Sequence, residues 1–282
     1  MKKILVCFLF VFSVSLIFAS VDILKDPSVT SELYKPIDVM TVERPQINPE
    51  FEMSNGVQSV KIPFAYPYQD FVFGLNLPLL RKTIVSFDGE KSKSPIGIGD
   101  MSLSAAYTSY LAEGFKGWDF DYAGNLTIKL PTGNKDRTVK MSGIEYAVPM
   151  GSGSWDFIIT GNALLRRNNR EIFSDLKFRL NGENDDDMKL GNMLSLKGRY
   201  GFLQFEPKFD GYISLLMIIG SDGKLGSADI EMSMFVIDIT PELHYLTPFG
   251  CVSVGISLPF ITSTKTKTTR DVIVRFGISK EY

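Results

Sequence analysis

The dominant pattern along the chain is an alternation of apolar and polar positions that begins near residue 57 and recurs to the end. In residues 119–130, the even positions carry Phe, Tyr, Gly, Leu, Ile and Leu, whereas the odd positions carry Asp, Ala, Asn, Thr and Lys. Because successive side chains of a β-strand point to opposite faces, this period predicts strands with one apolar and one polar face. The same period appears in residues 144–150, 203–217, 235–245 and 252–260.

Roughly ten to twelve such segments follow one another, separated by Gly-, Asn-, Asp- and Pro-rich turns, and helical periodicity is essentially absent, so the fold class is all-β. Several segments reach ten or more residues. Strands of soluble sandwiches have about 5–6 residues, whereas membrane-spanning strands need about 9–11. We therefore predict an antiparallel transmembrane β-barrel of about 12 strands, within a range of 10–14.

The connections between the segments differ in length, as they do in outer-membrane barrels, which have short turns at one end and long loops at the other. Residues 171–180 lie inside one expected loop but have strand-like composition, so they fit either a wall strand or a loop hairpin. Pro207 and Pro241 fall within expected strands and require bulges or positions at the membrane border. Short turns are expected at 151–154, 201–202 and 247–248, and long polar loops at 86–100, 131–140, 167–188 and 262–270.

The N-terminus has the composition of a secretory signal peptide, with Lys2 and Lys3, an apolar run over residues 4–18 and a small residue at Ala19. An uncleaved anchor helix is the alternative, but the run is shorter than the roughly 20 residues that span a bilayer. Residues 20–56 are rich in proline and lack a period. We predict a cleaved signal peptide at 1–19, an extended or periplasmic arm at 20–56 and the barrel at 57–282.

Composition excludes several kinds of protein. The 282 residues are 44% hydrophobic with a net charge of −2, which is too apolar for a disordered chain and too neutral for a nucleic-acid binder. Two cysteines and one histidine exclude a Cys/His zinc cluster and a disulfide framework. Asp185, Asp186 and Asp187 could collect a hard cation, but the run lacks the spacing of a calcium loop and fits a solvated loop better. We expect neither a metal centre nor a cofactor.

In a membrane barrel the apolar face contacts lipid and the polar face lines the lumen. The polar side chains predicted to face the lumen carry both signs of charge. They can therefore either close the interior by forming ion pairs or line a water-filled path. The lumen-lining candidates are Asp119, Asp121, Asn125, Lys129, Glu145, Asp156, Asn162, Lys197, Arg199, Glu206, Lys208, Asp210, Asp238, Glu242, His244 and Arg275.

His244 is the one side chain that could support conventional Ser–His chemistry. Ser253 or Ser257 could serve as nucleophile, with Asp238 or Glu242 as orienting group. No local nucleophile motif accompanies it, so we expect a polar histidine of the lumen and assign no catalytic residue.

The last segment alternates from Val272 to Ile278 and ends at Tyr282. It resembles the aromatic-terminated last strand that bacterial barrel proteins present to their insertion machinery. The resemblance implies outer-membrane lipids and this machinery as partners.

The most specific similarity lies in residues 125–134, which read NLTIKLPTGN, preceded by Gly97, Ile98, Gly99 and Asp100 and then Leu103, Ala105 and Tyr107. Together with residues 241–248, 258–260 and 272–279, these stretches resemble the outer-membrane MetA-pathway phenol-degradation transporters, relatives of the long-chain fatty-acid channels. The resemblance covers roughly residues 95–282. It implies a barrel of about twelve strands that moves small, often hydrophobic or aromatic, compounds across the outer membrane.

The sequence thus predicts a signal-cleaved outer-membrane channel, not an enzyme, for small-molecule cargo. The alternatives are an outer-membrane lipid-modifying enzyme, a structural barrel with a closed lumen, and a soluble periplasmic or secreted β-protein with its apolar face inside.

Overall fold

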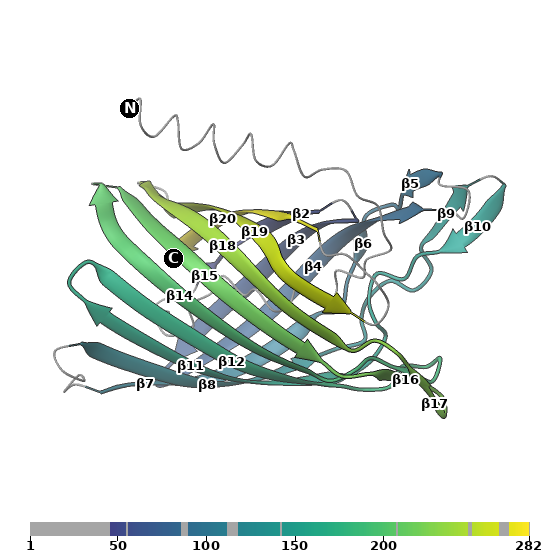
Figure 1. The fold of residues 1–282 in the computed structure, drawn as a ribbon, viewed down its shortest axis with the longest axis horizontal. Coiled ribbons are helices and arrows are strands. Elements are labelled where there is room, and N and C mark those ends of the chain that lie inside the picture. Colours follow the sequence, from purple (N-terminus) through teal and green to yellow (C-terminus); the bar gives the residue numbers. More distant parts are fainter. Residues whose placement is uncertain are drawn as a thin grey trace.

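The chain forms an antiparallel β-barrel (Figure 1). The computed structural model describes residues 46–281 except for 55, 86–89, 112–117, 142, 207, 248–249 and 265–270. The expected signal peptide at 1–19 and the terminal Tyr282 lie outside these residues. Over the described ranges, no helix has the length and apolar character needed to cross a membrane.

Twelve wall positions close the barrel, and the first of them is shared by two short strands, β1 (Gln46–Ile47) and β2 (Glu50–Met53). Each wall strand pairs antiparallel with its neighbours in sequence order. The remaining wall strands are β3 (Val57–Tyr68), β4 (Phe71–Val85), β7 (Ser102–Leu111), β8 (Asp119–Lys129), β11 (Asp156–Arg167), β12 (Arg170–Asn181), β14 (Met193–Glu206), β15 (Phe209–Gly220), β18 (Met234–Thr247), β19 (Gly250–Thr264) and β20 (Ile273–Glu281).

Closure occurs between the last strand and the first. Glu52 of β2 pairs with Arg275 of β20 on one side and with Ser59 of β3 on the other. The all-β fold class and the twelve-stranded antiparallel barrel are therefore confirmed. The lower limit of the barrel was wrong: it begins at Gln46 and not at 57, because the alternation of β2 is only four residues long and follows a proline-rich stretch.

The alternation along the wall places apolar side chains outside, whereas the inside carries the polar side chains together with some apolar ones, among them Leu164, Leu216 and Ile218. In β8, Leu126 is 50% exposed whereas Thr127 and Lys129 are each 1% exposed. In β11, Ile159 is 55% exposed and Asp156 is fully buried. This distribution is the reverse of a protein folded in water, and it is the one that hydrocarbon around the wall stabilises.

The two ends of the barrel differ. At the end that we call the turn end, two-residue turns join β3 to β4 and β11 to β12, and their Gln69 and Asn168 have positive φ. At the opposite end, which we call the loop end, long connections carry extra strands (Figure 1). These are β5 (Lys91–Lys93), β6 (Gly97–Ile98), the β9–β10 hairpin (Thr138–Met141, Ile144–Ala147), β13 (Met188–Lys189), β16 (Gly223–Leu225) and β17 (Ala228–Ile230).

Three expected connections were placed incorrectly. Residues 151–154 belong to the loop end, residues 201–202 lie within β14, and most of 167–188 is the wall strand β12. The open question about 171–180 is thus decided in favour of a wall strand, since β12 pairs with β11 and β14 over its length. The error at 167–188 arises because the polar inward positions of β12 make a wall strand look like a loop.

The prolines within the described wall strands β18 and β19 lie at positions where the strand tolerates them. Pro241 lies in β18 with its side chain exposed, opposite Ile213. Pro259 of β19 adjoins a register shift against β18, the irregularity that a proline without a ladder donor requires. Pro207 lies outside the described residues.

Aromatic rings gather at the turn end of the wall. Phe71 and Tyr107 have centroids 5.5 Å apart, and Phe209 and Tyr245 have centroids 4.8 Å apart. Such a belt suits the interface between hydrocarbon and water.

Candidate pore interior

Most of the lumen-lining candidates lie on the inner face of the wall. Asp119 has the inward parity but is exposed at the turn end of β8, and Glu206 ends β14 with a side chain outside the described set. The buried or half-buried inner residues are Asp121, Asn125, Lys129, Asp156, Asn162, Lys197, Arg199, Asp210, Asp238, Glu242, His244 and Arg275.

Two candidates lie elsewhere. Glu145 is on the β9–β10 hairpin beyond the wall, where it is exposed and accepts a hydrogen bond from Thr138 Oγ1 at 2.6 Å. Lys208 is exposed in the turn before β15. In both places the alternation of apolar and polar residues continues beyond the wall strands. The sequence pattern therefore does not show where the wall ends.

Several inner residues were missed. Glu50 and Glu52 fell in the expected arm, and Glu171, Lys177 and Arg179 fell in the stretch that fitted either a strand or a loop. All five are buried. The signal that could have found the second group is the odd-numbered spacing of its charges, opposite the apolar Ile172, Leu176, Phe178 and Leu180.

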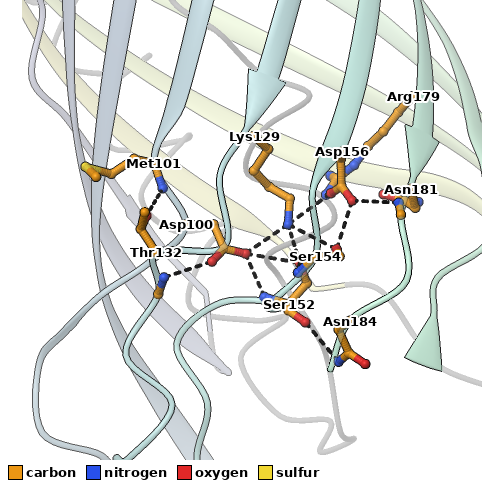
Figure 2. A network of polar contacts seen from close by, with 12 residues as sticks. Asp100, Met101, Lys129, Thr132, Ser152, Ser154, Asp156, Arg179, Asn181 and Asn184 are labelled. Atoms are coloured by element: carbon orange, nitrogen blue, oxygen red, sulfur yellow. Dashed lines mark hydrogen bonds and ion pairs between the residues drawn. The ribbon is translucent and has the colours of Figure 1, made fainter. Parts of the chain in front are cut away.

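A cluster of charges lies at the loop end of the interior (Figure 2). Lys129 Nζ from β8 is 2.9 Å from Asp100 Oδ2 and 3.0 Å from Asp156 Oδ2. Arg179 Nη2 from β12 is 2.6 Å from the same oxygen of Asp156. All four side chains are at most 5% exposed. We call these four residues the mouth cluster. Their signs alternate, so each charge is neutralised by a neighbour.

Further donors complete the coordination of the two carboxylates. Asp100 Oδ1 accepts the N–H of Gly133 at 2.9 Å, and its Oδ2 accepts the N–H of Ser152 at 2.8 Å. Asp156 Oδ1 accepts the hydroxyl of Ser154 at 2.8 Å and the N–H of Gly182 at 3.0 Å. Burying a carboxylate costs free energy unless its oxygens are hydrogen-bonded. These hydrogen bonds therefore allow the mouth cluster to be buried away from water.

Asp100, which lies in the connection before β7, supplies a pH prediction. Burial alone would raise its pKa, but the charge and hydrogen bond of Lys129 and the N–H groups of Gly133 and Ser152 hold the pKa below its usual 3.8. A lowered folded-state pKa contributes stability that is present above the unfolded pKa and is lost as the pH falls through the folded value. We expect stability to fall as the pH drops below about 4, and to fall less in Asp100→Asn.

The measurement is the urea midpoint of unfolding of both proteins at pH 6 and pH 3. Equal losses in the two proteins would show that Asp100 does not contribute to the acid response.

A second set of ion pairs lies deeper in the barrel. Arg275 Nε is 2.9 Å from Glu52 Oε1, and Lys61 Nζ is 2.8 Å from Glu52 Oε2. Arg199 Nη2 is 2.7 Å from Glu171 Oε1, and its guanidinium carbon lies 4.7 Å from the Tyr212 ring centroid. Arg199 is thereby fixed in place by an ion pair and by an aromatic face.

A cavity of about 100 Å³ adjoins these pairs. Long side chains from β14, β18 and β20 line it, including Lys197, Glu242 and Arg275. The inner positions of β19 that face it carry small residues, Ser253 and Gly255. The hollow exists because these small residues do not fill the space opposite the charged ones, and its volume is sufficient for several waters.

His244 lines the same cavity together with Glu242 and Ser253. Its Nε2 is 3.7 Å from Glu242 Oε2, and its ring centroid is 4.5 Å from that of Tyr212. Ser257, the other serine considered, donates to Asp238 Oδ2 at 3.4 Å. Within the described ranges, no group of three or more His, Cys, Asp or Glu is arranged to hold a metal ion, and Asp185 is ion-paired with Lys135.

Comparison with known proteins gives a likeness of fold. No protein-family model matches the chain, and no curated protein matches it. A solved structure described as the COG4313 outer membrane channel from Pseudomonas putida F1 superposes with a TM-score of 0.67 at 10% identity, covering 88% of this chain and 100% of that one. The NanC porin gives a TM-score of 0.49 at 6% identity, covering 84% of this chain and 99% of that one.

At 10% identity the first likeness establishes the fold, which is that of an outer-membrane β-barrel, and it is consistent with the resemblance found in the sequence.

Proposed function

We propose that this chain is an outer-membrane channel through which small molecules pass down their gradient. The observation that carries the proposal is the inverted wall, with leucine and isoleucine exposed outside and many ionised and hydroxylated side chains buried inside. Hydrocarbon around the barrel explains the outside, and a polar route for solutes explains the inside. The barrel likeness to the COG4313 outer membrane channel supports the same function.

For the cargo we propose small hydrophobic or aromatic compounds, as the family resemblance implies. The interior offers one feature suited to them. Phe173 and Tyr212 present ring faces to Arg199, whose guanidinium carbon is 5.1 Å and 4.7 Å from their centroids. Arg199 also lines the cavity, so a ring that carries an anionic group could pair with its guanidinium beside these aromatic side chains.

The alternatives fit the interior less well. An enzyme using His244 needs a serine hydrogen-bonded to the imidazole, whereas His244 Nε2 lies 3.7 Å from Glu242 Oε2 and the ring lies against Tyr212. A structural barrel with a closed lumen would pass no solute, which distinguishes it from a channel in the swelling test. A soluble β-protein would have its apolar face inside.

The first test of the channel is made on outer-membrane fractions and proteoliposomes. We expect the protein in the outer-membrane fraction, with a gel mobility that shifts only after boiling. We expect proteoliposomes to swell in an isotonic small sugar, since a polar interior admits hydrophilic solutes. Recovery in the soluble fraction without a heat shift would contradict the barrel in a membrane, and a heat-shifting protein without swelling would favour the structural barrel.

The cargo class is tested by a matched pair of solutes. Benzenesulfonate and cyclohexanesulfonate have the same charge and similar size, so a difference between them reports recognition of the aromatic ring. We expect faster swelling with benzenesulfonate. Equal rates would contradict the aromatic cargo and leave the channel itself intact.

A further inference from the structure

Residues 149–154, which we call the latch, fold into the loop end of the barrel. They follow the β9–β10 hairpin and lead into β11. Although they belong to a loop-end connection, Met150 is fully buried and Ser154 is 3% exposed. Figure 2 shows Ser152 and Ser154 beneath Lys129, pointing toward the mouth cluster. The latch is therefore packed against the interior and not extended into solvent.

Contacts with four separate parts of the loop end hold the latch. Lys82 Nζ donates to Pro149 O at 2.7 Å, and Met150 N donates to Asn134 O at 2.8 Å. Ser152 N donates to Asp100 Oδ2 at 2.8 Å, and Asn184 Nδ2 donates to Ser152 O at 3.1 Å. Met150 also belongs to an apolar cluster with Leu80, Val139, Met141 and Val148.

The barrel wall does not depend on the latch. Lys129 of β8 pairs directly with Asp156 of β11, so the wall ladder closes below the point where the latch departs. Side-chain and loop hydrogen bonds and the packing of Met150 hold the latch, and none of these contacts belongs to the wall ladder. Local opening of such segments costs less free energy than unfolding the strands that support them.

Little space remains between the latch and the wall residues beneath it. A space of about 20 Å³ remains between it and the wall, lined by Lys61, Asn76 and Pro78 from β3 and β4 and by Gly151 and Ser152 of the latch. That volume holds about one water molecule. A solute larger than water does not fit in this space.

The latch lies this close because residue 151 is glycine. A Cβ at this position would be 2.0 Å from Asp100 Oδ1 and 2.4 Å from its carboxyl carbon. Asp100 has little freedom to move away, since Lys129 and the N–H groups of Gly133 and Ser152 hold it. Any larger side chain must therefore displace the latch, the Asp100 carboxylate, or both.

We propose that the latch is an autoinhibitory element that closes the loop end of the barrel in this state and swings away from the mouth cluster to admit solute. The inference rests on the proposed channel function, and it adds the element that regulates entry. Asp100 is the positioning residue of the closed state, because it joins the latch backbone to Lys129.

The test that does not require conduction measures access to the space beneath the latch. Asn76→Cys places a thiol there, and its reaction with a small maleimide is followed by mass spectrometry at that residue. Adding Gly151→Ala should raise the labelling rate about tenfold, since overpacking at this tight contact destabilises the closed position of the latch. Gly124→Ala is the matched control, because a Cβ at Gly124 of β8 meets nothing within 4 Å.

A second test closes the latch reversibly. A Cβ at residue 153 would lie 3.7 Å from Asn184 Cβ, within the range that a disulfide spans. In Gly153→Cys/Asn184→Cys with Cys251→Ser, bilayer conductance should be lower when oxidised than when reduced. Comparing two redox states of one protein cancels any strain from the substitutions.

The outcomes separate the two proposals. Equal labelling in Gly151→Ala and Gly124→Ala would overturn the latch. Equal conductance of the oxidised and reduced protein, in a barrel that conducts, would also overturn it. Faster labelling in Gly151→Ala without conduction in any variant would support the latch and contradict the channel.

Discussion

Replacing Lys129 with methionine is expected to lower the free energy of unfolding by about 3–5 kcal/mol, the range typical of a buried ion pair that loses one partner. Methionine preserves most of the volume but removes the charge that lies 2.9 Å from Asp100 and 3.0 Å from Asp156. Asp156 keeps Arg179, whereas Asp100 keeps only neutral donors among the contacts described above. The measurement is equilibrium unfolding of the barrel in lipid vesicles.

Lys135→Met is the matched control for this prediction. Lys135 pairs with Asp185, and both side chains are largely exposed at 52% and 81%. Exposed pairs contribute little because water and salt screen them, so this variant should unfold like the unmodified protein. A Lys129→Met protein that is as stable as the control would show that the mouth cluster is not a stabilising feature of the barrel.

Replacing Leu215 with arginine is expected to destabilise the barrel by about 2–4 kcal/mol, the cost of a cation on the lipid face near the bilayer midplane. Leu215 lies in the middle of β15, is 52% exposed and has wall partners on both sides, Gly198 and Ile239. In water, an arginine at such an exposed position would be nearly neutral. The effect therefore depends on hydrocarbon around the wall.

Leu225 provides the control, since it has the same exposure of 52% but lies on β16 in the loop-end extension. Leu225→Arg should leave the folded fraction in vesicles unchanged, as measured by the heat shift and by urea titration. If both arginine variants are equally stable, the apolar face of β15 does not contact lipid, and the lumen assignments lose their basis.

The sequence by itself determined the fold class, because the period of two repeats over most of the chain and defines which residues share a face. On strands with clear alternation, the predicted polar parity is the one whose side chains are buried or half-buried, as at Asn125 and Lys129 of β8 and Asp238 and Glu242 of β18. In a strand of ten or more residues, the alternation alone defines which side chains share a face, so neighbouring strands are not needed to assign it.

Short or highly polar strands could not be read in this way. β2 has four residues, and it becomes part of the wall only because β20 and β3 lie on either side of it. Glu145 and Lys208 have the alternation of wall residues, and only the pairing of β10 with β9 and the turn before β15 place them outside the interior. Local pattern reports the face of a residue, but not whether a sheet continues beside it.

The tertiary structure alone decided what the inner charges do. Asp100 and Asp156 are 56 positions apart and meet on Lys129, and Glu52 meets Arg275 across the closure of the barrel. The short turn predicted at 151–154 is in fact a segment folded against Asp100. Side-chain partners across a barrel depend on closure and strand register, which arise from all twelve wall positions together and are not encoded in any one of them.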